Sequence, residues 1–416
     1  MKEVAMILDL DFIRSQYPVF TNPKTAGWAM FENAGGSYVP TQVIKRLNDF
    51  FQFTKVQPYG PFESSIAAGE AMDEGYQAIA ELIDCDSAEL TLGPSTSMNT
   101  YVLAQAVRPT LRPGDEVVVT NQDHEANIGC WRRLAEFGAI VREWRIDPQS
   151  GELSLADLAT LLNAKTRLVC FPLCSNIVGS MNDYKTICDM AHDVGALTVG
   201  DGVSYAPHQV LNSGASGLDI YLFSTYKTFG PHLGVMWCRG NVMDTLEPQG
   251  HYFNRGIPHY NFNPAGPLHA EIAAAAGIAA YIDAVYDHHF TETGPNLHAR
   301  ALKVFGLFGE HETRQANRIL EAIAAVPGSR IIGHKQAQAG FRAATISFTV
   351  EGMTSREVVK RLTVRKIAVR NGDFYAVRCL EGLGIKDTED GVVRISLVHY
   401  NSVGDVDRLV EALGDL

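Results

Sequence analysis

The sequence predicts an α/β fold in which a large, mainly parallel β-sheet is followed by a smaller α+β unit. Between about residues 75 and 240, short apolar runs alternate with amphipathic runs of helical length. This alternation is typical of parallel strands joined by crossover helices that cover both faces of a sheet. Near Tyr260 the pattern changes to long helical segments followed by scattered short strands, which indicates a second unit.

The strands of the large sheet are predicted from apolar runs that end in glycine or polar residues. They cover residues 116–122, 139–146, 166–174, 195–202, 219–226 and 234–240. The helices predicted between them cover residues 97–107, 126–137, 155–164 and 184–195.

The C-terminal part begins with an Ala-rich helix and ends with a short amphipathic one. Helices are predicted over 269–289, 298–326, 354–364 and 402–416, and strands over 342–350, 366–372 and 392–398. We therefore expect an N-terminal arm (1–25), a large domain (26–265), and a linking helix with a small C-terminal domain (266–416).

Composition excludes several classes of function. The 416 residues are 46% hydrophobic and carry a formal net charge of −12, which argues against a nucleic-acid or anionic-membrane partner. The first 20 residues lack the layout of a secretion signal, and no uncharged run is long enough to span a bilayer. The seven cysteines form no C-x-x-C pair, so we expect buried free thiols and a cytoplasmic protein.

Polar residues follow several of the predicted strands, where an open α/β sheet binds its ligands. Ser95 and Thr96 follow Gly93 and open a helix, so they either cap that helix or help to hold a phosphate. The segment is not a P-loop, because the Gly-Lys-Ser/Thr ending is missing. Asn176 ends another strand and either braces a turn or bonds a ligand oxygen.

His124 stands between two acidic residues, Asp123 and Glu125, at the end of a strand. It could serve as a base, a metal ligand, a stacking ring or an ordinary surface histidine. We expect no metal site, because no histidine or cysteine partner stands at ligand spacing nearby.

Asp201 and Lys227 are the most informative residues of this kind. A carboxylate such as Asp201 at the end of a buried strand is costly unless it has a cationic or hydrogen-bonding partner. Lys227 follows an apolar strand in "FSTYKTFGP", and a lysine forced into a pocket becomes a nucleophile toward carbonyl groups. An aldehyde cofactor needs such an amine near a carboxylate, a stacking ring and a phosphate site.

At these residues the chain resembles the cysteine-desulfurase branch of the class V aminotransferases, which are fold-type-I pyridoxal phosphate enzymes. The resemblance extends from "FENAGGSYVP" to "RISLVHYN" and includes a Ser/Thr loop, His-x-Ala-Asn, Asn-x-x-Gly, Asp-Gly, Ser-x-x-Lys and Arg-x-Ser in order. It implies a seven-stranded type of sheet, pyridoxal 5'-phosphate as cofactor, and a small amino acid as substrate.

The resemblance also implies roles for residues that contact the cofactor ring. Lys227 would join the cofactor aldehyde as a Schiff base and later move the Cα proton. Asp201 would pair with the pyridinium nitrogen, and His124 would stack on the ring face. Asn176 would bond the phenolic oxygen of the ring.

Further roles concern the phosphate, the substrate and the partner subunit. Ser95, Thr96 and Ser224 would bind the phosphate, and Arg394 would clamp the substrate carboxylate. A second protomer completes the cofactor site in this family, so a homodimer is implied, with residues 261–269 near the contact between subunits.

Three positions depart from the family pattern. Tyr375 stands where desulfurases carry the cysteine that takes up sulfur, and Cys379, four residues later, is expected to be an incidental buried thiol. Ser204 replaces a glutamine and Tyr226 a histidine, both beside the cofactor in the family. We expect cysteine-desulfurase-like C–S lyase chemistry without the usual persulfide cysteine. Transamination, epimerisation and decarboxylation stay open.

The choice among these reactions depends on side chains that orient the scissile bond and place an acid. The candidates for this selection are Arg370, which is also a candidate for substrate binding, Tyr226, which is also a candidate catalytic residue, Tyr375 and His208.

Three other functions are less well supported. A β-lactamase-like enzyme would use Ser224 as nucleophile and Lys227 as base, but the required Ser-x-Asn and Lys-Thr-Gly do not follow. A non-catalytic scaffold has no need of Lys227, Asp201 and Arg394. A nicotinamide dehydrogenase would carry Gly-x-Gly-x-x-Gly after its first strand, and the chain does not.

Overall fold

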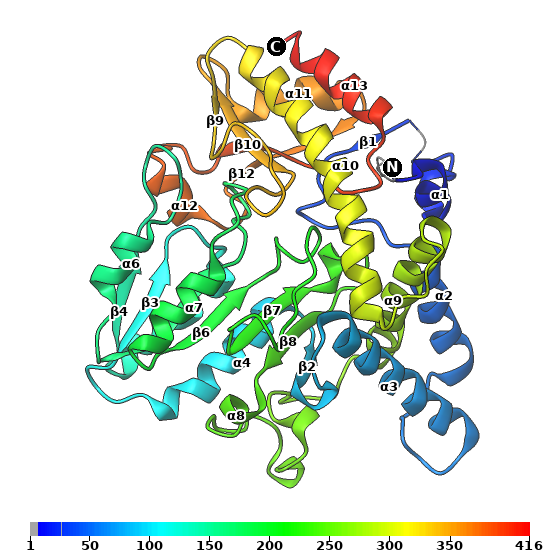
Figure 1. Cartoon of the computed structure of the whole chain (residues 1–416), viewed down its shortest axis with the longest axis vertical. Coiled ribbons are helices and arrows are strands. Elements are labelled where there is room, and N and C mark those ends of the chain that lie inside the picture. Colours follow the sequence, from blue (N-terminus) through cyan, green and yellow to red (C-terminus); the bar gives the residue numbers. More distant parts are fainter. Residues whose placement is uncertain (1–6, 26) are drawn as a thin grey trace.

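The computed structural model describes residues 7–25 and 27–416, and a seven-stranded sheet lies at its centre (Figure 1). The strand order is β2-β8-β7-β6-β5-β3-β4, and β8 runs opposite to the other six strands. The strands are β2 (Leu90–Gly93), β3 (Glu116–Thr120), β4 (Ile140–Trp144), β5 (Thr166–Pro172), β6 (Leu197–Asp201), β7 (Ile220–Ser224) and β8 (Gly234–Cys238). The predicted mainly parallel sheet is thus confirmed.

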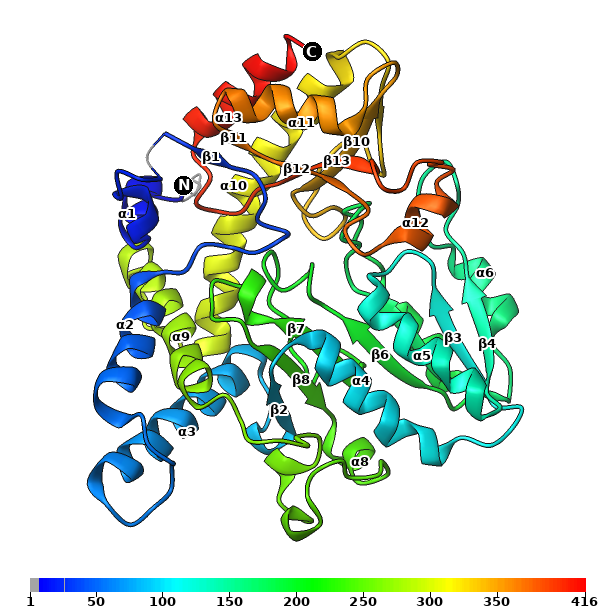
Figure 2. The ribbon, with the colours of Figure 1, turned by 180° about the vertical axis from the view of Figure 1, so that it is seen from behind.

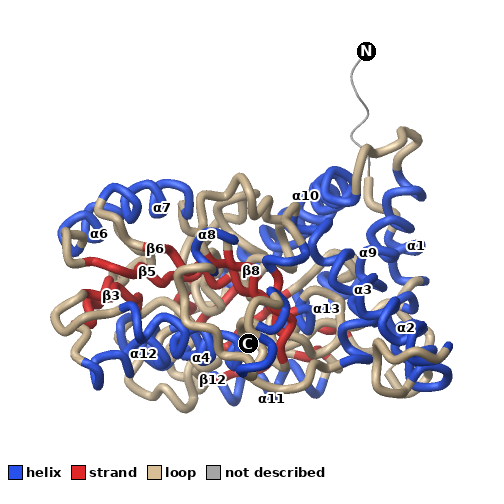
Figure 3. Tube along the Cα trace, turned by 90° about the horizontal axis from the view of Figure 1, so that it is seen from below, coloured by secondary structure: helices blue, strands red, loops and turns tan. Residues whose placement is uncertain are grey.

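The sheet is buried on both faces, which explains its apolar strands. Val118 packs into one hydrophobic core, whereas its neighbours Val117 and Val119 pack into the core on the opposite face. Helices α6 (Leu155–Leu161) and α7 (Tyr184–Asp193) lie on one face, and α4 (Thr96–Val107) lies on the other (Figure 3).

The helix predicted over residues 126–137 is wrong as one continuous element. The structure has α5 (Gly129–Arg132) between the 3-10 turns Glu125–Asn127 and Arg133–Phe137. The break has a local cause, because Ile128 has a non-helical backbone and His124 caps the first turn through its ring.

The smaller unit is built on an antiparallel sheet with the order β12-β13-β10-β9. Its strands are β9 (Ser329–Ile331), β10 (Thr345–Val350), β12 (Arg370–Gly372) and β13 (Val392–Ser396), and its helices are α11 (Ser355–Val364), α12 (Val377–Gly382) and α13 (Val403–Leu413). The single strand predicted over 366–372 is divided, because β11 (Ile367–Ala368) leaves this sheet to pair with β1 (Ala29–Met30).

Two long helices connect the units. They are α9 (His269–His289) and α10 (Leu297–Ala325), and α9 packs against α2 (Thr41–Asp49) and α3 (Glu63–Ile83). Glycine allows this close approach: a Cβ at Gly75 would lie 1.9 Å from the carbonyl oxygen of Ile272.

The remaining short elements lie between these helices and strands or before them. They are α1 (Leu10–Ser15), α8 (Gly240–Met243), a π turn at Phe50–Thr54, and 3-10 turns at Pro18–Phe20, Ser87–Glu89, Arg108–Thr110, Thr225–Lys227, Tyr252–Asn254 and Pro258–Tyr260. Of the helices in residues 7–25 and 27–416, none combines the length and apolar character needed to cross a membrane.

The segment that begins with β1 lies beside the C-terminal unit (Figure 2). The amide of Phe31 donates to the carbonyl oxygen of Ala368, at 2.8 Å, and the amide of Ser396 donates to that of Phe31, at 2.7 Å. The expected division into an arm and two domains stays a prediction, and residues 1–6 of the arm and residue 26 lie outside the described part.

Candidate active site

The predicted site residues gather at one edge of the large sheet. Strands β2, β3, β5, β6 and β7 run in one direction, so the segments that follow them share this edge. Strand β13 of the smaller unit and the segment after β1 approach it, since Arg394 and Glu32 both interact electrostatically with Lys227.

Lys227 ends the 3-10 turn that follows β7. Two hydroxyl groups fix the segment: Thr225 Oγ1 donates to the carbonyl oxygen of Pro231, at 2.6 Å, and Thr228 Oγ1 to that of Ser224, at 3.1 Å. Burial lowers the pKa of Lys227 from 10.5 to about 8, and the positive charge of Arg394 acts in the same direction. The amine is therefore partly unprotonated near neutral pH, as a nucleophile must be.

Two buried carboxylates, Asp201 and Asp123, interact with each other, and Asp201 also interacts with the Lys227 amine. Asp201 is 5% exposed and accepts a hydrogen bond from the amide of Val203, at 2.8 Å. Burial raises its pKa from 3.8 to about 6, although the hydrogen bond and the positive charge of Lys227 oppose the shift. Burial and the negative charge of Asp201 also raise the pKa of Asp123 well above its usual range.

His124 presents a neutral ring. Its pKa falls to about 3, mainly through burial and further through the positive charges of Lys227 and Arg394. Nδ1 accepts a hydrogen bond from the amide of Ala126, at 3.1 Å, so the proton of the neutral ring is on Nε2. The ring of Tyr375 lies 5.2 Å away between centroids.

The three predicted phosphate residues lie together near the start of α4. Ser95 Oγ caps this helix by accepting a hydrogen bond from the amide of Met98, at 3.2 Å. Thr96 Oγ1 donates to the carbonyl oxygen of Phe223, at 2.8 Å, next to Ser224. A Cβ at Gly234 would lie 2.2 Å from the carbonyl carbon of Ser95, so this glycine lets the helix start pack directly on β8.

Arg394 is 2% exposed and contacts several groups. Nη2 donates to Glu32 Oε1, at 3.2 Å, and Nη1 donates to the carbonyl oxygen of Asn176, at 3.3 Å. The Phe374 ring covers the guanidinium, with its centroid 3.7 Å from Cζ. Burial lowers the pKa of Arg394 to about 10, so the side chain stays charged at neutral pH.

Glu32 and Phe374 belong to the site but were not predicted from the sequence. Glu32 gave a weak signal as a carboxylate in the apolar run "AMFENA", whereas Phe374 gave none. Three buried atoms of this cluster have no hydrogen-bond partner among residues 7–25 and 27–416: Glu32 Oε2, Asn176 Oδ1 and Arg394 Nε.

Two of the predicted residues lie at the margin. The side chain of Arg370 is exposed, and its Nη1 lies 3.8 Å from Glu32 Oε1. Tyr226 is 39% exposed and its ring lies 5.0 Å from that of His232. A Cβ at Gly36 would lie 2.4 Å from the Tyr226 ring, so this glycine makes room for the tyrosine.

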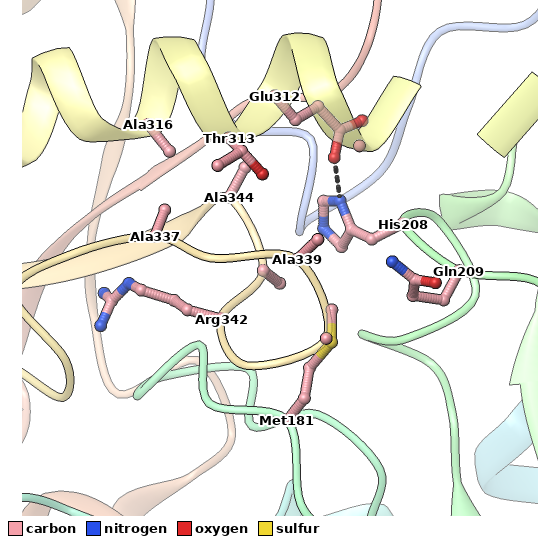
Figure 4. A pocket seen from close by; sticks show the side chains of 13 residues that line it. Met181, His208, Gln209, Glu312, Thr313, Ala316, Ala337, Ala339, Arg342 and Ala344 are labelled. Carbon is pink, nitrogen blue, oxygen red and sulfur yellow. Dashed lines mark hydrogen bonds and ion pairs between the residues drawn. The ribbon is translucent and has the colours of Figure 1, made fainter. Parts of the chain in front are cut away.

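Two further predicted residues, Ser204 and His208, are buried. Ser204 lies three residues after Asp201, in the segment that follows β6. In the same segment, His208 Nδ1 lies 2.6 Å from Glu312 Oε2 of α10 (Figure 4). The cavity beside this pair measures about 10 Å³, room for one water molecule at most.

Tyr375 and Cys379 differ sharply in exposure. Tyr375 is 72% exposed, whereas Cys379 is fully buried in α12 among apolar side chains. Burial raises the pKa of the Cys379 thiol from 9.0 to about 12, which disfavours the reactive thiolate.

Comparisons with known proteins cover nearly the whole chain. Residues 29–409 match the family model for class-V aminotransferases. An aminotransferase-like protein of Gibberella zeae is 34% identical over 97% of each chain. A cysteine desulfurase-like protein of Aspergillus flavus is 27% identical over 99% of this chain and 91% of its own length.

The fold is also that of a solved structure. The apo cysteine desulfurase of Thermococcus onnurineus has a TM-score of 0.84 at 23% identity, covering 99% of this chain and 98% of its own. At this identity the likeness establishes the fold alone.

Proposed function

Because the chain belongs to the class V aminotransferases, a family of pyridoxal-phosphate-dependent enzymes, we propose that it acts at the Cα of an amino acid with this cofactor. The observation that carries the proposal is the Lys227 amine, whose pKa is lowered to about 8 and which the Asp201 carboxylate attracts electrostatically.

The residues at this edge of the sheet fit the cofactor. The N-terminus of α4, with Ser95 and Thr96, suits a phosphate because unpaired amides and the helix dipole favour an anion. Asp201 suits a protonated ring nitrogen, and the neutral ring of His124 suits stacking. When bound, the cofactor supplies an electron sink for the negative charge that develops at Cα.

The other roles in the proposed reaction belong to side chains of the protein itself. Lys227 holds the cofactor and carries the Cα proton on Nζ, which its lowered pKa permits near neutral pH. Asp201, with a pKa of about 6, is ionised at neutral pH and offsets the positive charge of the ring nitrogen. Arg394 binds the substrate carboxylate, and Arg370 at the margin assists it.

For the reaction itself, we propose a desulfurase-type elimination that breaks a C–S bond without a persulfide cysteine. Two observations support the absence of a persulfide cysteine: Tyr375 stands at the position expected for it, and Cys379 is buried with a raised pKa. Cleavage of a C–S bond is supported by the likeness to the cysteine desulfurase-like protein of Aspergillus flavus. Transamination or epimerisation on the same scaffold would leave the roles of Lys227 and Asp201 unchanged.

We also propose a homodimer in the cytoplasm. Large aromatic side chains are exposed near the π turn and near the 3-10 turn at 252–254, and they favour association with another surface. They are Phe51, Phe53, Tyr59, Phe62, Tyr252 and Phe253. The seven cysteines are unpaired thiols, as is usual in a reducing compartment.

The cofactor is tested by colour. Once unbound pyridoxal phosphate has been removed, the purified protein is expected to be yellow and to lose its visible band on borohydride reduction, which leaves the cofactor covalently attached to it. The same treatment of Lys227→Ala should leave no covalent adduct. Lys185→Ala, at an exposed lysine of α7, is the matched control and keeps the band. A wild-type protein that retains no visible band once unbound pyridoxal phosphate has been removed would overturn the proposal.

The reaction is tested with a panel of amino acids, by assaying sulfide, keto acid and racemised product in parallel. Sulfide from cysteine that persists in Cys379→Ser supports elimination without a persulfide on that residue. Keto acid or racemised product without sulfide contradicts C–S cleavage and identifies the alternative.

A further inference from the structure

The loop between β12 and α12, residues 373–376, has an unusual backbone. Phe374 and Tyr375 are both in the left-handed region, with φ of 50° and 60°, and they follow Gly372 at 134°. This conformation costs a bulky residue roughly 1 kcal/mol or more. Two successive bulky residues adopt it only where surrounding contacts enforce it.

Contacts from the large sheet hold this loop in place. Asn176 Nδ2 donates to the carbonyl oxygen of Phe374, at 3.0 Å, and the amide of Glu125 donates to that of Tyr375, at 2.7 Å. Asn176 follows β5 and Glu125 follows β3, so both donors belong to the edge that carries the site. The loop of the smaller unit is thereby attached to the large sheet beside the candidate active site.

Phe374, Asn176 and Arg394 form a closed cycle of contacts. The Phe374 ring covers the Arg394 guanidinium, Arg394 Nη1 donates to the carbonyl oxygen of Asn176, and Asn176 Nδ2 donates to that of Phe374. Glu32 engages Nη2, the remaining terminal nitrogen. One face and both terminal nitrogens of the guanidinium are thus occupied, while Nε is buried without a partner among residues 7–25 and 27–416.

We propose that Phe374 is a positioning residue that fixes the plane of Arg394, so that Nε is directed at the carboxylate of the substrate. This inference rests on the proposed function, because it assumes an amino-acid substrate. The negative face of an aromatic ring attracts a guanidinium, and the attraction is stronger away from water, as it is for the buried Arg394. A leucine would fill similar space without that negative face.

The test compares two amines that differ in the carboxylate. L-Alanine and isopropylamine are each titrated into the cofactor-loaded protein, and their dissociation constants are taken from the shift of the visible band. Phe374→Leu is expected to raise the dissociation constant of L-alanine by about tenfold and to leave that of isopropylamine unchanged. Phe374→Tyr keeps the aromatic face, so its dissociation constant for L-alanine is expected to equal that of the wild-type protein.

Two controls separate positioning from a general effect on the fold. Phe137 is an exposed residue before β4, and its ring centroid lies 4.7 Å from Cζ of Arg108. Phe137→Leu removes this ring from a guanidinium elsewhere on the protein and is expected to leave both dissociation constants unchanged. In the Arg394→Gln background, Phe374→Leu is expected to add nothing, because the two changes act on one interaction.

The outcomes distinguish this inference from the function it rests on. A wild-type protein without a visible band contradicts the proposed function. A wild-type protein with the band, combined with a Phe374→Leu variant that binds L-alanine normally or loses both amines equally, overturns the positioning role alone.

Discussion

At the scale of single residues, the buried carboxylate of Asp201 lowers the stability of the protein without its cofactor. Its pKa rises from 3.8 to about 6 on folding because the carboxylate is buried. Between these pH values the unfolded chain loses the proton while the folded protein keeps it, so stability falls as the pH rises. The loss reaches its full value about one pH unit above the folded pKa and amounts to roughly 3 kcal/mol.

Asp201→Asn is therefore expected to stabilise the apoprotein by roughly 2–3 kcal/mol at pH 7.5, because burying an uncharged amide costs less free energy than burying a carboxylate. The gain should shrink as the pH falls toward 4, and urea unfolding at the two pH values measures it. The same variant should bind pyridoxal phosphate weakly. An unchanged or lower stability at pH 7.5 would contradict the argument.

Asp147→Asn is the matched control of opposite sign. The Asp147 carboxylate accepts hydrogen bonds from the amide and the hydroxyl group of Ser150 and from the amide of Gln149, and these lower its pKa below the usual value of 3.8. Replacing this exposed, hydrogen-bonded carboxylate should lower stability at neutral pH rather than raise it.

At the scale of elements, α11 ends on a strained residue. Lys366, two positions beyond the last helical residue, has φ of 57°, a conformation that costs a side-chain-bearing residue about 1 kcal/mol. Its amide donates to the carbonyl oxygen of Thr363, at 2.9 Å, which closes the helix end and needs no side chain.

Lys366→Gly is therefore expected to stabilise the protein by about 0.5–1 kcal/mol, since glycine adopts this backbone without strain. Lys360→Gly, the same change at an exposed position inside α11, should destabilise it by about 1 kcal/mol. Chemical denaturation of the two variants measures both values, and equal signs would contradict the explanation.

How well an element could be predicted depended on where its stabilising contacts come from. The strands of the large sheet were predictable because each is buried on both faces, which makes its own sequence apolar. Strand β11 was not recognised as separate from β12, because its two residues are held by β1, more than three hundred positions earlier. No local pattern records so distant a partner.

At the scale of the whole molecule, the same distinction applies to the candidate site. Lys227, Asp201 and His124 were predictable because each lies at or just after the end of a parallel strand of one sheet, so all three lie at the same edge of that sheet. Glu32 and Phe374 reach the site from another unit. Their contacts with Arg394 depend on how the two units fit together, and the local sequence does not encode that fit.

The proposed homodimer leads to a prediction at this scale. Phe53, 69% exposed in the π turn, is expected to lie in the subunit contact, so Phe53→Glu should place a charge there and produce monomers with little activity. Val364→Glu, on the exposed end of α11, should leave the assembly unchanged. Sedimentation velocity measures both variants, and a monomeric wild-type protein would contradict the proposal.

The pairing of β1 with β11, and of Glu32 with Arg394, has a consequence for biosynthesis. A ribosome that adds roughly 5–20 residues per second needs about 20 s to 1 min between making the first partner and the second. During that time the N-terminal segment waits without its strand partner, exposed to chaperones and proteases. A nascent chain released before residue 394 lacks Arg394, so truncated products cannot bind a carboxylate through it, however well their large sheet has formed.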